Sequence, residues 1–170
     1  TITNPETGGN MILALPAFGA VVSNLPFVPF EIIPADDKDE ISKMPFVDIL
    51  DGRSDLYCYI ATKIADVIKP EGTLGIIVSN SWLGTNAGIK LMEALKQEYN
   101  IKQVHISGQG RWFKNADVVT TILVLEKKKN SNCVDTDFWL WQLSLEQLAE
   151  NPDAENTLVN SALLSSELDR

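Results

Sequence analysis

Residues 20–27 join an apolar run to a polar amide, a proline and an aromatic ring. The apolar run ends at Asn24, whose side-chain oxygen can accept a hydrogen bond. Pro26 restricts Leu25 to extended backbone conformations through a steric clash, so the direction of the Leu25 carbonyl is fixed. The sequence therefore predicts two rigid acceptors, the Asn24 side chain and the Leu25 carbonyl, beside the ring of Phe27.

Two convergent acceptors beside a flat apolar surface suit an exocyclic amino group on an aromatic base. The nitrogen of such a group is a poor nucleophile, because its lone pair is delocalised into the ring. When both N–H bonds are held by acceptors, the nitrogen can approach tetrahedral geometry and its lone pair can attack a methyl donor. A neighbouring ring can hold a base flipped out of its duplex, where stacking is worth about 1–3 kcal/mol. This chemistry requires no metal ion.

Four short β-branched runs are predicted as buried strands, and helical spacing of apolar residues separates them. The helical patterns run from Leu56 to Ile68 and from Ile89 to Tyr99. Strands separated by helices predict a parallel sheet covered on both faces, with ligands at the carboxyl ends of its strands. The last two strands are joined by a short segment without helical spacing, so we expect them to pair antiparallel at one edge. The predicted strands are residues 19–23, 72–79, 101–107 and 118–126.

Two further segments lie outside this plan. Residues 34–45 contain an acidic run and are predicted as an exposed loop. Beyond residue 129 we expect one strand at residues 138–141, a short helix at 143–150 and an acidic linker or extension.

The composition excludes several classes of protein. With 45% hydrophobic residues among 170, the chain can bury a core, and its 23 acidic against 14 basic residues give a net charge of −9. That charge argues against a nucleic-acid clamp that works by charge alone. The spacing of Cys58 and Cys133 indicates neither a disulfide scaffold nor a zinc site. No apolar run is long enough for a membrane helix, so we expect a cytoplasmic location without membrane contact.

Four segments carry a resemblance to a known family. Asn24-Leu25-Pro26-Phe27 is similar to the Asn-Pro-Pro-Tyr/Phe motif of adenine-N6 methyltransferases that use S-adenosylmethionine. Residues 54–57, 69–83 and 113–127 resemble, in order and spacing, the second half of the catalytic domain in bacterial restriction-modification DNA methyltransferases. The resemblance covers roughly residues 18–129 and implies an α/β, partial Rossmann-like methyltransferase fold.

The resemblance implies a role for each motif residue. Asn24 would accept one hydrogen of the adenine amino group, and the Leu25 carbonyl would accept the other. Phe27 would stack on the flipped base. Phe113 matches the position from which a second aromatic residue closes the adenine pocket, and Trp112 beside it is a competing candidate.

The sequence departs from the family pattern in two ways. Leu25 stands where the family usually has proline, which leaves the backbone acceptor in place but loosens the pocket. The glycine-rich loop that holds S-adenosylmethionine is missing ahead of the motif, so the cofactor-binding residues are unknown. We therefore expect residues 1–129 to be the C-terminal half of a catalytic domain, and residues 130–170 to be an acidic extension.

On this reading the chain alone is inactive and the full-length protein binds DNA, with a specificity or nuclease domain or subunit as a further partner. Two other functions remain open from the residues. A protein glutamine-N5 methyltransferase presents a planar amide nitrogen to the same acceptors, and a degenerate methyltransferase-like domain would be a scaffold without catalysis.

Other polar residues have ordinary structural interpretations. His105 is expected in the core, and Asp55 is expected to cap a helix, with a cofactor-side role as the alternative. Residues 108–110 are expected to form a plain loop, and residues 127–129 a solubilising strand end. Trp139 and Trp141 are expected to pack on one face of a strand, and Cys58 is expected to be a buried filler.

Overall fold

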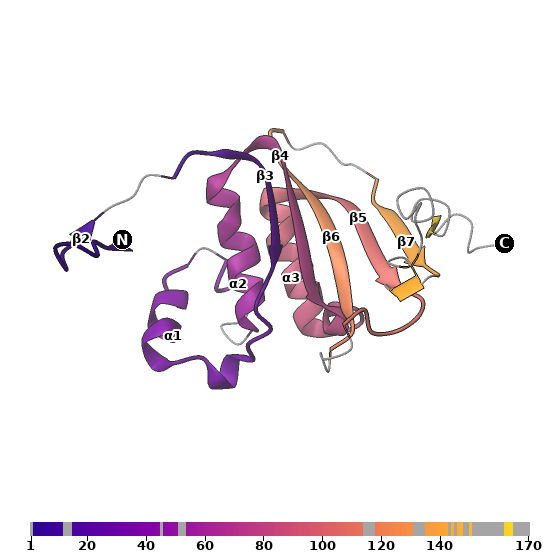
Figure 1. Cartoon of the computed structure of the whole chain (residues 1–170), viewed down its shortest axis with the longest axis horizontal. Coiled ribbons are helices and arrows are strands. Elements are labelled where there is room, and N and C mark those ends of the chain that lie inside the picture. The colour runs from indigo at the N-terminus through magenta and orange to yellow at the C-terminus, as the bar shows by residue number, and fades with distance from the viewer. Residues whose placement is uncertain are drawn as a thin grey trace.

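The computed structural model describes residues 2–11, 15–44, 46–50, 54–113, 118–130, 135–142, 144, 146–147, 150 and 162–164. Within them, a hairpin of two strands precedes a six-stranded sheet in the order β3-β4-β6-β5-β7-β8 (Figure 1). The strands are β1 (Ile2–Thr3), β2 (Asn10–Met11), β3 (Phe18–Asn24), β4 (Ile68–Ser79), β5 (Tyr99–Ser107), β6 (Thr120–Lys127), β7 (Asp137–Trp141) and β8 (Ala162–Leu164). The helices are α1 (Ala35–Ile41), α2 (Leu56–Lys63) and α3 (Asn86–Glu98), with short 3-10 helices η1 (Phe30–Ile32), η2 (Ile64–Val67) and η3 (Asn80–Trp82).

The strand directions confirm the expected α/β class. β3 pairs parallel with β4, β5 pairs parallel with β7, and β6 is antiparallel to both β4 and β5. Four strands, β3, β4, β5 and β7, therefore share one direction, and β5 and β6 form the predicted antiparallel pair. This pair is not outermost, because β7 extends the sheet beyond β5.

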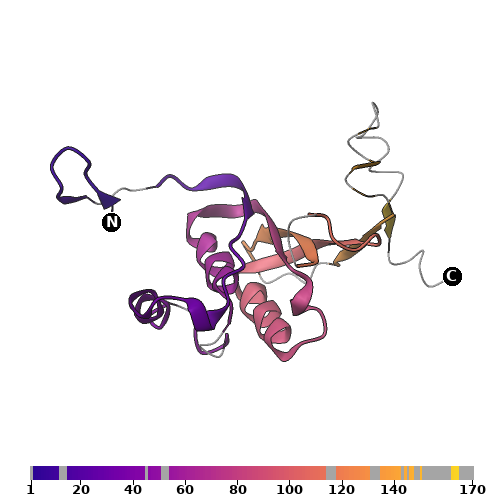
Figure 2. The same cartoon turned by 60° about the horizontal axis from the view of Figure 1, so that its bottom comes forward.

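The core lies between one face of the sheet and the helices α2 and α3, which Figure 2 shows on the same side. Strand residues alternate between two faces, so every second residue of β4 points toward these helices. The fully buried side chains of this layer include Leu74, Ile76 and Val78 of β4, Leu123 and Leu125 of β6, and Leu91 and Leu95 of α3.

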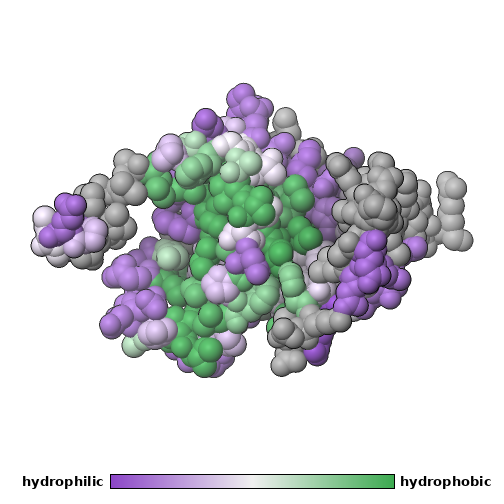
Figure 3. Space-filling model, viewed as in Figure 1, coloured by the Kyte–Doolittle hydropathy of each residue, from purple (hydrophilic) through white to green (hydrophobic). Residues whose placement is uncertain are grey.

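The opposite face of the sheet carries no described helix. Val22 of β3 is 88% exposed there, and Ile77, Ile122 and Val124 are half-buried beside it. Figure 3 shows hydrophobic residues gathered over this part of the sheet. The predicted parallel sheet is thus covered on one face only within the described residues, and β3 has a described partner strand on one side only.

Residues 34–45 correct one prediction, because most of this segment is helical rather than an exposed loop. Asp36 and Asp37 lie in the first turn of α1, where negative charge interacts favourably with the helix dipole. Ile41 at the end of α1 is only 4% exposed and joins the core. The acidic residues therefore stabilise the start of a helix here, although the same residues are also common in exposed loops.

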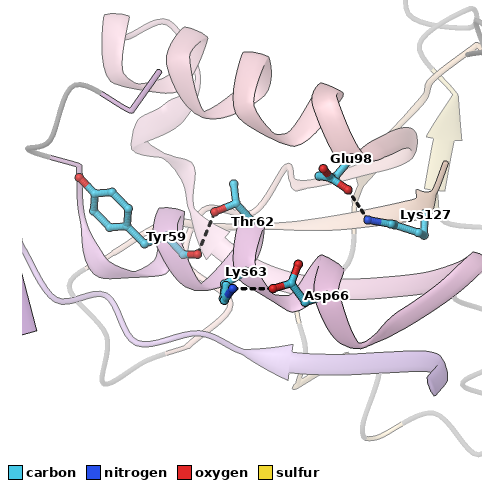
Figure 4. A network of polar contacts seen from close by, with 6 residues as sticks. All are labelled: Tyr59, Thr62, Lys63, Asp66, Glu98 and Lys127. Carbon is cyan, nitrogen blue, oxygen red and sulfur yellow. Dashed lines mark hydrogen bonds and ion pairs between the residues drawn. The ribbon is translucent and has the colours of Figure 1, made fainter. Parts of the chain in front are cut away.

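The two longer helices follow the predicted positions and end in polar contacts (Figure 4). The segment predicted as one helix from residue 56 to 68 forms α2 and then η2, and Lys63 at the end of α2 pairs with Asp66 at 2.5 Å. Glu98 at the end of α3 pairs with Lys127 at the end of β6. The first pair joins α2 to η2, and the second joins the end of α3 to the sheet.

The C-terminal part is described only in pieces. β7 confirms the strand predicted at residues 138–141. The helix predicted at residues 143–150 and the acidic extension fall largely outside the described residues, as does Cys133, and the boundary at residue 129 stays a prediction. In the described part of the chain, no helix is both long enough and apolar enough to span a membrane.

Candidate functional site

The amide of Asn24 lies at the carboxyl end of β3. Because β3 and β4 are parallel, with Asn24 paired to Ile77, both strands end at the same edge of the sheet. Alternation along β3 puts Val22 and Asn24 on the face without a described helix, and both side chains are exposed. Asn24 is therefore open to a ligand rather than enclosed by core packing.

The three residues after Asn24 have different environments. Leu25 is only 4% exposed and belongs to the hydrophobic core, whereas Pro26 is exposed. Phe27 is half-buried and packs against the core. The buried Leu25 side chain anchors the backbone on one side of Pro26, so the turn after β3 is held at a fixed place beside the exposed amide.

Phe27 contacts an aromatic residue that the sequence motifs alone did not assign. Its ring centroid lies 5.9 Å from that of Tyr57, with the two planes at 82°. Tyr57 is only 3% exposed, and burial raises the pKa of its hydroxyl well above the usual range, so the group stays protonated at neutral pH. The only signal in the sequence was its place in the segment 54–57, which resembles the family.

Asp55 occupies the expected N-cap position of α2, but its side chain makes no capping hydrogen bond. Burial raises the pKa of the Asp55 carboxyl, and a hydrogen bond from the backbone N–H of Phe30 opposes this shift. The carboxylate thus faces the loop after Phe27, not the first turn of its own helix.

Small polar side chains continue the site along the edge of the sheet. Ser79 ends β4 and its hydroxyl donates to the Ser81 hydroxyl at 2.8 Å. Asn80 accepts a hydrogen bond from the Thr121 hydroxyl at 2.9 Å, which ties the end of β4 to the start of β6. This edge therefore carries polar side chains at the carboxyl ends of parallel strands, where ligands bind in open sheets.

Phe113 and Trp112 lie in the segment that joins β5 to β6, which enters the sheet at this same edge. Phe113 is 36% exposed and Trp112 is half-buried. The segment therefore carries one accessible ring at this edge of the sheet, while residues 114–117 lie outside the described part. The assignment of Phe113 as the second aromatic residue, with Trp112 as the alternative, stays a prediction.

His105 is held as a neutral structural side chain. It stacks with Trp139 and Trp141 at centroid distances of 6.1 and 5.6 Å. Its Nδ1 accepts a hydrogen bond from Trp141 at 3.1 Å, so its Nε2 carries the proton and donates to Gln103. Burial lowers the pKa of His105, in keeping with the expected structural role and not with that of a general base.

The other structural interpretations agree with the contacts. Lys127 pairs with Glu98, and Lys129 pairs with Glu71 at 3.0 Å, so these lysines bind within the chain at the strand end. Cys58 is buried, and burial raises the pKa of its thiol to about 12. A thiol in that environment is unreactive at neutral pH.

Among the described residues, neither the turn at residues 108–110 nor any cluster of metal-ligating side chains points to a cofactor or metal site. In the turn at residues 108–110, the Gly108 N–H donates to the Trp141 carbonyl and the Gln109 N–H donates to the Ser107 hydroxyl, so neither is free for an anionic ligand. No cluster of three or more metal-ligating side chains occurs among the residues the structure describes. An open groove of about 360 Å³ lies along η3 and α3 and contains neither Asn24 nor Phe27.

A family model and two curated proteins, one of which is described here, match this chain in sequence. The model of the Eco57I restriction-modification methylase family matches residues 13–113. The type II methyltransferase M.BanIII of Aneurinibacillus aneurinilyticus is 28% identical over 116 residues, which cover 68% of this chain and 19% of that protein. The chain thus spans about a fifth of the length of this relative.

Solved structures show the same fold at low identity. A protein of Listeria monocytogenes, described as a class I S-adenosylmethionine-dependent methyltransferase, matches with a TM-score of 0.64 and 20% identity over 88% of this chain and 43% of its own. The type IIG restriction endonuclease BpuSI matches with a TM-score of 0.59 and 14% identity over 86% of this chain and 18% of its own. The first comparison shows that the sheet has the fold of class I methyltransferases, and the second shows that BpuSI contains a similar fold.

Proposed function

Because the chain belongs to the Eco57I restriction-modification methylase family, we propose that it is the target-base half of a DNA adenine-N6 methyltransferase. The single observation that carries the proposal is the exposed Asn24 amide at the end of β3, followed by the buried Leu25 and the Phe27 ring. An aromatic amine needs an accessible hydrogen-bond acceptor beside a flat ring, and the exposed Asn24 amide and the nearby Phe27 ring offer both.

The proposed roles follow from hydrogen-bonding capacity. The Asn24 side-chain oxygen accepts one N–H of the adenine amino group, and the Leu25 backbone carbonyl accepts the other. With both protons held, the nitrogen lone pair is freed from the ring for attack on a methyl group. Phe27, and Phe113 or Trp112 from the segment before β6, hold the base by stacking.

S-adenosylmethionine supplies the methyl group in this reaction class, and the one glycine-rich turn considered for it has the N–H groups of Gly108 and Gln109 already bonded within the chain. We therefore assign cofactor binding to other parts of the full-length protein and expect this chain alone to be inactive. DNA and a specificity or nuclease domain or subunit are the proposed partners, since the structural relative BpuSI is a restriction endonuclease.

The family match favours DNA over a protein glutamine side chain as the methyl acceptor, although both present a planar nitrogen to two acceptors. Binding of S-adenosylmethionine distinguishes the two enzyme hypotheses, which require it, from a non-catalytic scaffold. Calorimetry of the full-length protein with S-adenosylmethionine is expected to show binding, and its absence would favour the scaffold.

The test of the proposed function measures transfer of labelled methyl groups to plasmid DNA by the full-length protein. Asn24→Ala removes one acceptor from the reacting nitrogen, so we expect kcat to fall by roughly 10²–10³-fold, as on loss of one oxyanion-hole donor. Phe27→Ala removes the stacking surface and is expected to raise the KM for DNA and to lower kcat.

A matched control substitutes an amide that is also exposed but lies beyond the C-terminal end of β6. Asn130→Ala is expected to leave the methylation rate at the wild-type value. Wild-type rates in both Asn24→Ala and Phe27→Ala would overturn the assignment. Transfer to protein but not to DNA would point to glutamine methylation instead.

A further inference from the structure

The ring of Phe27 contacts the ring of Tyr57, which is the second residue of α2. The two rings meet edge to face, with centroids 5.9 Å apart and planes at 82°. An edge-to-face contact fixes the plane of a ring, whereas an aliphatic neighbour of the same volume fills space without selecting an orientation. The plane of Phe27 matters because a stacked base must lie parallel to it.

Tyr57 is itself fixed by its surroundings. It is 3% exposed, and its hydroxyl forms a hydrogen bond with the side chain of Ser81. Ser81 is bonded in turn to Ser79 at the end of β4, with 2.8 Å between the two hydroxyl oxygens. A continuous set of contacts therefore connects the end of β4, through Tyr57, to the ring beside the end of β3.

Hydrogen bonds that involve backbone groups also connect the start of α2 to the loop after Phe27. The Leu56 N–H donates to the Val28 carbonyl at 2.9 Å. The Asp55 carboxylate accepts a hydrogen bond from the backbone N–H of Phe30. The start of α2 thus holds the loop after β3 at three points, and Tyr57 is the one that bears on the Phe27 ring.

We propose that Tyr57 is a positioning residue, which sets the plane of the Phe27 ring relative to the Asn24 amide so that a flipped base lies with its amino group between the two acceptors. The inference rests on the proposed function of Asn24 and Phe27. Tyr57 does not touch the base in this arrangement. It acts through Phe27, and Asp55 and Leu56 hold the backbone of the loop that carries the ring.

The experiment uses the full-length protein and reads base stacking directly. The recognition sequence is first obtained by mapping N6-methyladenine in plasmid DNA that the wild-type protein has methylated. A duplex of that sequence with 2-aminopurine in place of the target adenine then reports stacking, because its fluorescence is quenched when the flipped base lies on an aromatic ring. Steady-state methylation of the unmodified duplex gives kcat and KM separately.

Tyr57→Phe keeps the ring and is expected to retain wild-type fluorescence and kcat. Tyr57→Leu and Tyr57→Met fill the space without a ring. We therefore expect the fluorescence of bound 2-aminopurine to increase and kcat to fall by about tenfold, which corresponds to the free energy of one aromatic pair. The affinity for DNA is expected to change little, because phosphate contacts elsewhere dominate it. If one of the two aliphatic variants fails to fold, the other still tests the proposal.

The matched control is Tyr99→Leu, the same substitution in the same core at the amino end of β5. It is expected to lower stability without any change in the fluorescence of bound 2-aminopurine. If both aliphatic variants of Tyr57 match the wild type, or change no more than Tyr99→Leu does, the positioning role is wrong while the proposed function stands. If Phe27→Ala also leaves fluorescence and kcat unchanged, the proposed function itself is wrong.

Discussion

Gly88, the third residue of α3, gives the sharpest stability prediction. A Cβ built on it would meet the Trp82 carbonyl oxygen of η3 at 1.7 Å, whereas real Cβ contacts shorter than 3.0 Å are essentially never seen. A carbonyl oxygen cannot rotate away as a side chain can, so Gly88→Ala must push α3 away from η3. Overpacking of this kind costs about 3 kcal/mol at the upper end of its usual range. The better helix propensity of alanine offsets about 1 kcal/mol.

The net loss expected for Gly88→Ala is therefore about 2 kcal/mol. Urea unfolding of the 170-residue chain, followed by far-ultraviolet circular dichroism, measures this loss directly. In a thermal scan it corresponds to a melting temperature lowered by roughly 4–8 °C for a protein of this size.

Gly75→Ala provides the matched control. A Cβ at Gly75 meets only the Val22 side chain, at an ordinary 3.8 Å. Because glycine in a strand is entropically unfavourable, this variant is expected to be as stable as the wild type or about 0.5–1 kcal/mol more stable. A Gly88→Ala chain that melts at or above the wild-type temperature would refute the close packing of α3 on η3.

Two further predictions concern a helix cap and a buried imidazole. The Thr85 hydroxyl accepts a hydrogen bond from the Gly88 N–H at 3.1 Å, so Thr85→Ala is expected to lower the free energy of unfolding by about 1 kcal/mol in urea titrations, and Thr85→Ser to restore most of it. Burial lowers the pKa of His105 below its ordinary value of 6.5, so the unfolded chain takes up this proton first as the pH falls. The contribution of His105 to stability is therefore present above pH 6.5 and lost as the pH drops toward the folded-state pKa. His105→Gln should lose less stability between about pH 7.5 and 5.5 than the wild type, and an equal loss in both proteins would contradict the neutral, Trp141-bonded imidazole.

Much of the fold follows from local patterns in the sequence. The β-branched runs predict β3, β5 and β6 to within two residues at each end, because each run is bounded by turn or polar residues. β4 begins at Ile68, four residues before the predicted start and at the residue predicted to end the helix. The short segment between β5 and β6 predicts their antiparallel pairing, since a parallel return needs a longer crossover. The acidic run at residues 36–40 was misread, because the same charges suit both a solvated loop and the first turn of a helix.

The sequence also places the site residues that lie together along the chain. Asn24, Leu25 and Phe27 follow a strand directly, and the structure puts them at its carboxyl end, with Asn24 exposed and Leu25 buried. Their predicted chemical roles remain to be tested. Phe113 was matched by position only, and its relation to Phe27 depends on a segment that is partly outside the described residues.

By itself, then, the sequence determined most of the strands and the two longer helices, the parallel start of the sheet and the position of Asn24, Leu25 and Phe27 at the end of a strand, because hydrophobic period acts over a few residues. Tertiary structure alone decided that β7 extends the sheet beyond β5, that His105 is enclosed by two indoles, and that Tyr57 meets Phe27. Each of those contacts joins residues about 30 or more positions apart in the chain. Their partners are selected by how whole layers pack, and no local pattern records that choice.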